Sequence, residues 1–285
     1  MNPVGKRIAM PRVLLLIILL LGCLLSACHH EPEELPVIRL GHAPHDHHAA
    51  RYVVAQLPDY FKQHGGVFLK EIEYRKQYQL MAADQPVADL VIDSGVGGGQ
   101  LVRKLHENRY DVALGGAPAM VKQIIKGSDL RIVAPLMSEG AALVVGNDFP
   151  ATDWASFVAA IKASDRPIRI GYKFKGAVQH FVFEKALEVE GISFAHQEMG
   201  TDTKVVLVDL FGAKNLIPAM KNSLIDGFVV MQPFVAMAEH QQVGKTISPL
   251  RNLPPGTDWH DHPCCALAAN GSLLQNERAV LVDLV

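Results

Sequence analysis

The chain has 285 residues, a formal net charge of −2 at pH 7, 49% hydrophobic residues and 20% charged residues. Its length exceeds that of a typical single domain, and its apolar content can fill a large core, so one large or two smaller domains are expected. A slightly acidic chain lacks the basic surface that nucleic-acid binding requires, which excludes nucleic acid as a partner.

Residues 1–27 are predicted to be a cleaved secretory signal. Basic residues precede an unbroken apolar run over residues 13–21, which is too short to span a membrane. The sequence LSAC over residues 25–28 follows, and it resembles the lipobox of bacterial lipoproteins, in which the cysteine accepts a diacylglyceryl group. We therefore expect a mature chain that begins at lipidated Cys28, with residues 28–36 as a tether to the membrane on the extracytoplasmic face of the cell envelope. A plain signal peptide with an incidental cysteine is the alternative.

From residue 37 onward, short apolar strands alternate with helical stretches. The first part is predicted to contain strands at 37–40, 69–74, 88–92, 111–114 and 131–136. Its helices are predicted at 48–63, with an interruption at Pro58, and at 100–108 and 118–126. The second part is predicted to contain strands at 142–145, 168–171, 204–208, 226–230 and 264–269. Its helices are expected from a cap at Thr152 or Asp153 to about 163, and at 177–190, 213–222 and 233–241. Residues 276–285 are predicted to start a helix for which the sequence gives no stop signal, so the chain is expected either to be a fragment or to lack a C-terminal helical segment.

This alternation predicts an α/β architecture with largely parallel sheets, arranged as two lobes. The chain is expected to cross between the lobes near residues 135–140 and again near residues 231–244. Lobe 1 is accordingly assigned residues 37–137 and 240–285, and lobe 2 residues 138–239.

Four segments carry a family resemblance. They are DVALGGAP at 111–118, IGYKFKGAVQ at 170–179, LIDGFVVMQP at 224–233 and HPCC at 262–265. In their order and spacing they resemble periplasmic solute-binding proteins of the nitrate, sulfonate and taurine type. The resemblance implies a bilobal type II periplasmic-binding-protein fold, with two parallel-rich sheets flanked by helices and a two-segment hinge. It also implies a monomer that binds a small molecule, has no enzymatic activity, and delivers its ligand to an ABC permease with its ATPase.

The candidate ligand-binding residues follow the predicted strands, because open α/β sheets bind ligands beyond the carboxyl ends of their strands. Small residues after a strand let a ligand reach backbone amides, and a lysine with free amides suits an anion, for which Lys173 and Lys175 are the candidates. At position 232 this chain has glutamine, whereas the family that it resembles usually has glutamate. The expected set is His42, His45, His47, His48, Gly115, Gly116, Ala117, Pro118, Ser138, Lys175, Gly176, Ala177, Met231 and Gln232.

The loop GHAPHDHH over residues 41–48 leaves three interpretations open, namely a metal site, contact with an organic ligand, or no role in binding. Imidazoles suit zinc, copper, nickel or iron, and a metal site would need at least two of these histidines to converge, with Asp46 as ligand or supporting partner. We favour direct contact with an organic ligand and expect neither a metal nor a cofactor. The adjacent Cys264 and Cys265 are interpreted as small buried strand residues, with a redox or metal role as the alternative.

The sequence therefore predicts a lipid-anchored, extracytoplasmic solute-binding protein for an organic anion, a sulfonate or a heterocycle. A metal-binding or metal-chelate-binding protein is one alternative. The fold is also similar to that of thiamine-pyrimidine synthases, which sacrifice a histidine and use iron, so an enzyme of that kind is another. A ligand-binding module that feeds a sensor kinase is the third.

Overall fold

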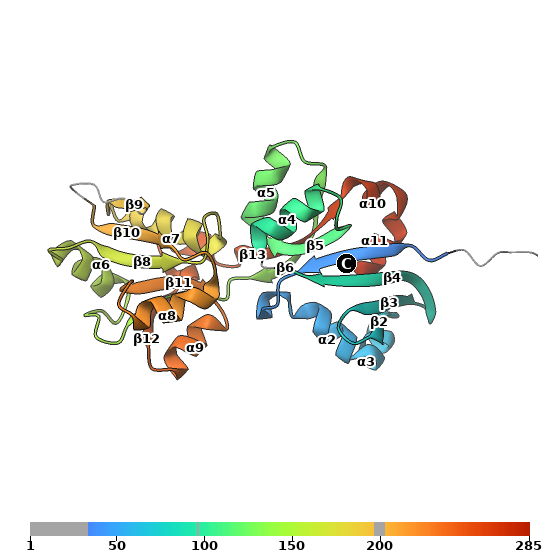
Figure 1. Cartoon of the computed structure of the whole chain (residues 1–285), viewed down its shortest axis with the longest axis horizontal. Helices are drawn as coiled ribbons and strands as arrows, with labels where there is room; N and C mark the ends of the chain where they lie inside the picture. Colours follow the sequence, from blue (N-terminus) through green and yellow to red (C-terminus); the bar gives the residue numbers. More distant parts are fainter. Residues whose placement is uncertain (1–33, 96, 197–202) are drawn as a thin grey trace, which may run out of the picture. The chain divides into compact units, whose positions relative to one another are not determined.

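The computed structural model describes residues 34–95, 97–196 and 203–285. Contacts within the chain group Pro36–Val285 into one compact unit, which contains two β-sheets with helices against them (Figure 1). The predicted signal and Cys28 lie outside the described residues. Within the described ranges, no helix is both long enough and apolar enough to cross a bilayer.

The first sheet has seven strands in the order β2-β3-β4-β1-β5-β13-β6. At its centre, β1 pairs in parallel with β4 and β5, while the outer pairings are antiparallel. The strands are β1 (Val37–His42), β2 (Val67–Glu73), β3 (Gln77–Ala82), β4 (Gln85–Ser94), β5 (Val112–Gly116), β6 (Leu130–Ser138) and β13 (Pro263–Asn270). The associated helices are η1 (Asp46–His48), α2 (Ala50–Gln56), α3 (Pro58–His64), α4 (Gly98–His106), α5 (Ala117–Ile125), α10 (Gly271–Asn276) and α11 (Arg278–Leu284).

Strand alternation divides the core of the first sheet between its two faces. Val112 and Leu114 of β5 pack with residues of α2, α10 and α11, whereas Ala113 between them packs with α4 and α5. Both faces of β5 are therefore buried, which explains why its sequence is apolar without interruption.

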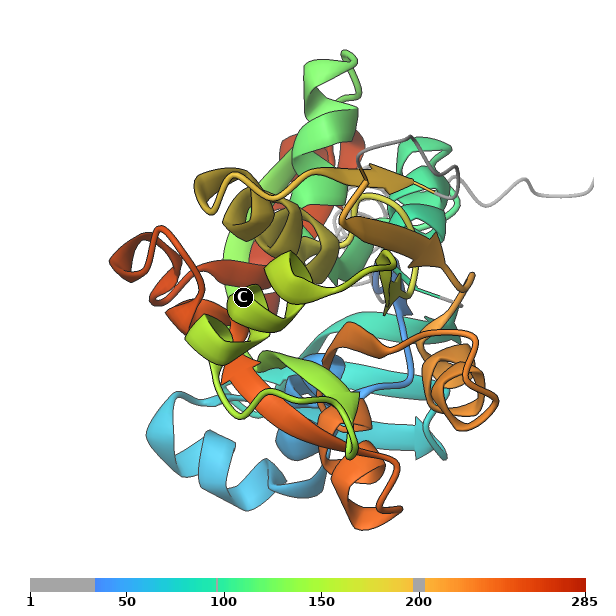
Figure 2. The ribbon, with the colours of Figure 1, turned by 90° about the vertical axis from the view of Figure 1, so that its left-hand side faces the viewer.

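The second sheet has six strands in the order β12-β7-β11-β8-β10-β9, and it faces the viewer in Figure 2. Its core includes the fully buried rings of Phe157, Phe183 and Phe228. The strands are β7 (Ala141–Gly146), β8 (Ile168–Tyr172), β9 (Phe194–His196), β10 (Val205–Asp209), β11 (Gly227–Met231) and β12 (Gly244–Pro249). The helices are α6 (Trp154–Ala163), α7 (Val178–Val189), α8 (Leu216–Lys221) and α9 (Phe234–His240), with short turns η2 (Ala213–Asn215), η3 (Leu250–Asn252) and η4 (Thr257–Trp259).

The predicted α/β fold class is confirmed, with one correction to the sheets. Antiparallel strands flank the parallel centre, so the first sheet is mixed rather than parallel-rich. Strands β3, β9 and β12 were not predicted. Because β12 pairs with β7, the second sheet continues beyond residue 239 to Pro249, and the chain rejoins the first sheet only at β13.

Local signals placed several boundaries correctly and misplaced others. Asp153 caps α6 and forms a reciprocal capping box with Ser156, as the sequence indicated. The strand predicted over residues 37–40 continues to His42. Gly41 lies inside this strand, β1, where the ring of Tyr110 occupies the space that a Cβ atom would need.

In each sheet, an aspartate just before a central strand accepts hydrogen bonds from the backbone of a neighbouring strand and from an arginine side chain. We call this arrangement the carboxylate brace. Asp111 precedes β5 and Asp226 precedes β11. The Asp111 carboxylate accepts the backbone N–H of Arg39 at 2.8 Å and the Asp226 carboxylate accepts that of Arg169 at 2.8 Å, so each aspartate is tied to the neighbouring strand. The Arg39 guanidinium donates to Asp111, and the Arg166 guanidinium donates twice to Asp226, at 2.9 and 2.7 Å.

Asp226→Asn should lower the free energy of unfolding by about 1–2 kcal/mol, because it weakens charge-assisted hydrogen bonds to a partly exposed arginine. Burial alone would raise the pKa of Asp226, but the hydrogen bonds from Arg166 and Arg169 lower it below its usual range. That stabilisation is complete above the unfolded-state pKa of about 3.9 and is lost as the pH falls through the lower folded-state pKa. Urea unfolding of both chains should show the difference shrinking below pH 4.

The exposed Asp165 offers a matched control. Asp165→Asn should change the free energy of unfolding by less than about 0.5 kcal/mol. A difference between wild type and Asp226→Asn that stays constant down to pH 3 would contradict the assigned role of the brace.

Candidate functional site

A small pocket lies where β1, β5 and β8 end and β13 begins. Its volume is about 20 Å³, which is room for a species of the size of one water molecule. Residues associated with both sheets line it, and we call it the His–Cys pocket. Its lining residues are His45, His48, Gly116, Ala119, Lys173, Phe174, Gly176, Ala177, Val178, Gln179, Cys264 and Cys265.

His42 has a structural role inside this region. Its Nδ1 lies 2.9 Å from the carbonyl oxygen of Ala43, and the guanidinium of Arg51 lies 2.7 Å from its Nε2. One neutral tautomer satisfies both contacts, with Nδ1–H donating and Nε2 accepting, and burial lowers the pKa of His42 in agreement with a neutral ring. Both ring nitrogens are therefore engaged within the protein, so His42 differs from the other predicted histidines.

The other three histidines of the loop converge. The ring centroids of His45 and His48 are 4.4 Å apart, and those of His45 and His47 are 5.7 Å apart. His48 Nδ1 accepts the backbone N–H of Ala43 at 2.8 Å, which leaves its Nε2 without a hydrogen-bond partner among the residues that the structure describes. His45 Nδ1 and His47 Nε2 are also buried without one. Unpaired buried polar atoms are costly, so this group is suited to a bound polar species.

Burial keeps two of these rings uncharged. It lowers the pKa of His45 to about 3, with a further contribution from the nearby Lys173, and it lowers that of His48 as well. His45 and His48 are thus neutral donors or acceptors at physiological pH rather than cations.

His47 faces the two cysteines. Its Nδ1 lies 3.3 Å from Cys264 Sγ and 3.8 Å from Cys265 Sγ, and the two sulfur atoms are 4.0 Å apart as free thiols. The hydrogen bond from Cys265, together with His47 and the positive charge of Lys173, lowers the pKa of Cys264, while the same hydrogen bond and burial raise that of Cys265. Although burial opposes it, the hydrogen bond to Cys264 raises the pKa of His47. The arrangement favours a thiolate on Cys264 beside an imidazolium.

The second sheet supplies an amine and an amide to the same pocket. Lys173 follows β8, its Nζ lies 3.6 Å from Met231 Sδ, and burial lowers its pKa. Gln179 in the first turn of α7 is 2% exposed, and its amide nitrogen lies 3.5 Å from Cys264 Sγ. Within the described part of the chain, its Oε1 has no hydrogen-bond partner.

The predicted site residues divide into three groups. The pocket includes His45, His48, Gly116, Gly176 and Ala177 in its lining. Two others contact lining residues: His47 contacts Cys264, and Met231 contacts Lys173. The remaining predicted residues are not among the lining residues, namely His42, Gly115, Ala117, Pro118, Ser138, Lys175 and Gln232.

Local contacts explain two of these differences. Lys175 is exposed and gives its backbone N–H to Asp209, so Lys173 is the lysine that reaches the pocket. The side chain of Gln232 accepts the backbone N–H of Ala236 in α9. The side-chain amide that lines the pocket is therefore that of Gln179 and not that of Gln232. Gln179 is the last residue of the segment IGYKFKGAVQ. Its position in the first helical turn after a glycine-bearing loop was the sequence signal that could have identified it as a pocket residue.

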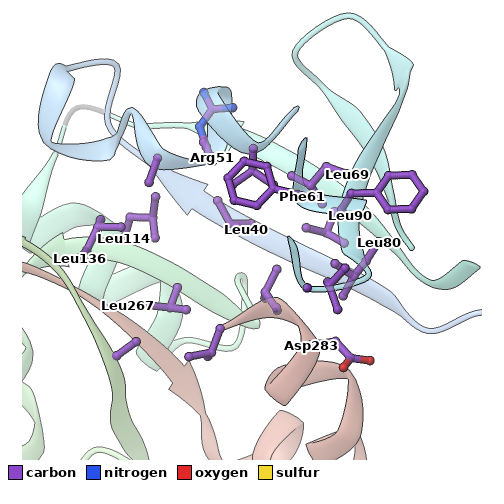
Figure 3. Close-up of a pocket in the computed structure, with 18 of the residues that line it drawn as sticks. Leu40, Arg51, Phe61, Leu69, Leu80, Leu90, Leu114, Leu136, Leu267 and Asp283 are labelled. Atoms are coloured by element: carbon purple, nitrogen blue, oxygen red, sulfur yellow. The ribbon is translucent and has the colours of Figure 1, made fainter. Parts of the chain in front are cut away.

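A larger pocket of about 550 Å³ lies elsewhere, against the first sheet. Figure 3 shows leucines of four strands at its wall, Leu40, Leu69, Leu80 and Leu90, together with Phe61 of α3. Its walls are mainly apolar and lie along the face of the sheet, with Arg51, His64 and Asp283 among its few polar lining residues. The His–Cys pocket, at the strand ends, is instead lined by histidine, lysine, glutamine and cysteine side chains, which are the converging polar groups that orient a ligand.

Residues 31–285 match the profile of the NMT1-like family. The chain belongs to the NMT1-like family. Among curated proteins, it is 28% identical to the uncharacterized protein MJ1180 of Methanocaldococcus jannaschii over 144 residues, which cover 49% of this chain and 99% of that one.

Solved structures share the fold of this NMT1-like chain. A ligand-binding component of an ABC-type import system from Staphylococcus aureus, solved with zinc bound, has a TM-score of 0.63 at 18% identity, covering 87% of this chain and 70% of that one. The aliphatic sulphonate-binding protein SsuA of Escherichia coli has a TM-score of 0.59 at 15% identity, covering 88% and 70%. The nitrate-binding protein NrtA of Synechocystis PCC 6803 has a TM-score of 0.59 at 19% identity, covering 88% and 60%.

The two thiols should titrate separately. In the wild-type chain, the ultraviolet absorbance of a thiolate should appear below the ordinary cysteine pKa of about 8.5, because Cys264 ionises first. Cys265→Ala removes the hydrogen-bond donor to Cys264 and should shift that titration to higher pH.

Cys264→Ser is the control for this titration, and it should abolish the low-pH absorbance step. If both thiols of the wild type titrate at or above pH 8.5, the electrostatic description of the pocket is wrong.

Proposed function

We propose that this protein is a lipid-anchored, extracytoplasmic solute-binding protein. It captures a small organic anion, a sulfonate or a heterocycle and delivers it to an ABC permease and its ATPase, without catalysing a reaction. The observation that carries the proposal is the convergence of Lys173, Gln179 and the imidazoles of His45 and His48 on one pocket at the ends of β1, β5 and β8. Ligands of open α/β sheets bind at this end of the strands.

The donor set suits a small polar solute. Lys173 offers positive charge, and the histidines offer neutral ring nitrogens. Gln179 offers an amide oxygen that no described residue hydrogen-bonds. Such a set can neutralise an anion and also hydrogen-bond a heterocycle. The structural neighbours include a sulphonate-binding and a nitrate-binding protein, which supports an anion as the solute.

Two adjacent crossing segments would act as the hinge. The chain leaves the first sheet after β6 and returns at β13, and Glu139 joins the two crossings. Its backbone N–H donates to the carbonyl of His262, while its carboxylate accepts the backbone N–H of Asp261 at 2.9 Å and a guanidinium N–H of Arg251 at 3.0 Å. We assign residues 37–137 with β13 onward to one lobe, and residues from about 138 through β12 to the other. Because a solute larger than water exceeds the 20 Å³ of the pocket, the lobes must separate to admit it.

Lipid anchoring makes a prediction about mass. The full chain expressed in a bacterial envelope should yield a mature form that begins at Cys28 and carries a diacylglyceryl group, detected by intact-mass spectrometry. Cys28→Ser should lose both the lipid and the membrane association, whereas Cys264→Ser should keep them. A mature wild-type chain without added lipid mass would contradict the anchor.

Solute binding makes a second prediction. In a thermal-shift screen with an alkanesulfonate, nitrate and an aminopyrimidine, a solute present at 100 times its dissociation constant should stabilise the folded chain by about 2.7 kcal/mol. Lys173→Met should reduce that gain, because it removes the ammonium group from the pocket. Lys175→Met changes an exposed lysine outside the lining and should preserve the gain.

Two results would overturn the proposed function. The first is that no member of the panel stabilises the chain. The second is that Lys173→Met and Lys175→Met lose the stabilisation equally.

A further inference from the structure

Three metal-ligating side chains meet beside the pocket. His47, Cys264 and Cys265 are 2%, 3% and 5% exposed, and their donor atoms all lie within 4.8 Å of one another. Thiolate sulfur and imidazole nitrogen are the ligands that zinc and other thiolate-preferring ions select.

The distances between these donors are close to those of a filled site. Bond lengths of about 2.3 Å to sulfur and about 2.0 Å to nitrogen, at tetrahedral angles, separate two sulfurs by about 3.8 Å and a sulfur from a nitrogen by about 3.5 Å. The corresponding separations here are 4.0 Å for the two sulfurs, and 3.3 and 3.8 Å from His47 Nδ1 to Cys264 and Cys265. Shifts of a few tenths of an ångström would complete the arrangement.

An irregularity in β13 brings the two adjacent cysteines to one side. Consecutive side chains of a regular strand point to opposite faces of its sheet. The register of β13 against β6 shifts between Pro263 and Cys265, and again between Cys265 and Ala266. Such a shift re-aims a side chain, and here both sulfur atoms lie near the same imidazole nitrogen.

The His–Cys pocket provides a fourth position. Cys264 and Cys265 line it together with His45, whose Nδ1 has no hydrogen-bond partner in residues 34–95, 97–196 and 203–285. Its volume of about 20 Å³ suits one ion or one donor atom of a solute. A divalent ion would match the charge of two thiolates, so the buried cluster would be neutral.

We propose that His47, Cys264 and Cys265 bind a thiolate-preferring metal ion such as Zn²⁺, with the fourth coordination position open to the pocket. This inference rests on the proposed function in one respect, which is that the ion lies where the solute is proposed to bind. If it is correct, the solute is a metal ion or a small molecule that coordinates one.

The test uses Zn²⁺ alone on the full chain, purified with reductant and treated with chelator. Competition with a chromophoric chelator should show one tight equivalent, and Co²⁺ in its place should give a sulfur-to-metal charge-transfer band. Cys264→Ser, Cys265→Ser and His47→Asn should each weaken Zn²⁺ binding by about 100-fold or more, because loss of supporting partners alone costs 10–100-fold. Circular dichroism and melting temperature check that each variant is folded.

A second group in the described residues supplies the matched control. His180, Glu184 and His196 could also hold an ion, although His196 Nε2 is already 2.7 Å from Glu184 Oε1 and the group has no thiol. Glu184→Gln should leave the tight equivalent unchanged. Zn²⁺ binding that is lost with Glu184→Gln but survives the cysteine variants would overturn the proposal. A Co²⁺ complex without the sulfur band, or no tight binding, would also overturn it.

The outcome separates this inference from the proposed function. If Zn²⁺ binds as expected and no organic solute stabilises the chain, the metal site stands and the capture of an organic solute fails. If organic solutes bind the chelator-treated chain through Lys173 and Zn²⁺ does not bind, the metal inference fails alone.

Discussion

The pairing of β13 between β5 and β6 is the constraint on which the site depends. This strand returns after the whole second sheet has been built, and it enters the first sheet antiparallel to both neighbours. Its register sets Cys265 opposite Gly116, and its irregular start turns both cysteines toward His47. Residues more than 200 positions apart in sequence, such as His47 and Cys264, therefore meet through backbone pairing rather than through local structure.

The pocket joins groups with opposite electrostatic requirements. Neutral imidazoles, a thiolate-forming cysteine and a lysine with a lowered pKa are enclosed within a few ångströms. Burial penalises each isolated charge, so the most stable arrangement is one in which charges compensate one another or a bound species compensates them. This electrostatic balance connects the proposed solute binding with the proposed metal ion, since both place a compensating charge in the same enclosure.

Strand-helix alternation made the fold predictable, whereas the site depended on long-range pairing. Asp153 as a helix cap is a local signal, and the structure follows it. The edge strands β9 and β12 were missed because they are short or weakly patterned, and their pairing is decided by the neighbouring strand. The pocket contains Lys173 instead of Lys175, the lysine in the expected set, because packing sets the direction of a side chain in a loop. Likewise, the contact between His47 and the cysteines has no signature in either sequence segment.

Hydrogen exchange of the full chain is the most direct test of whether these segments form one binding site. The chain would be measured alone and with the tightest-binding member of the set formed by Zn²⁺, an alkanesulfonate, nitrate and an aminopyrimidine. We expect slower exchange to arise together in η1, in residues 173–179 and at the start of β13, three segments far apart in sequence. Protection confined to α3 and α11 around the large apolar pocket, or to one of the three segments alone, would contradict a shared site.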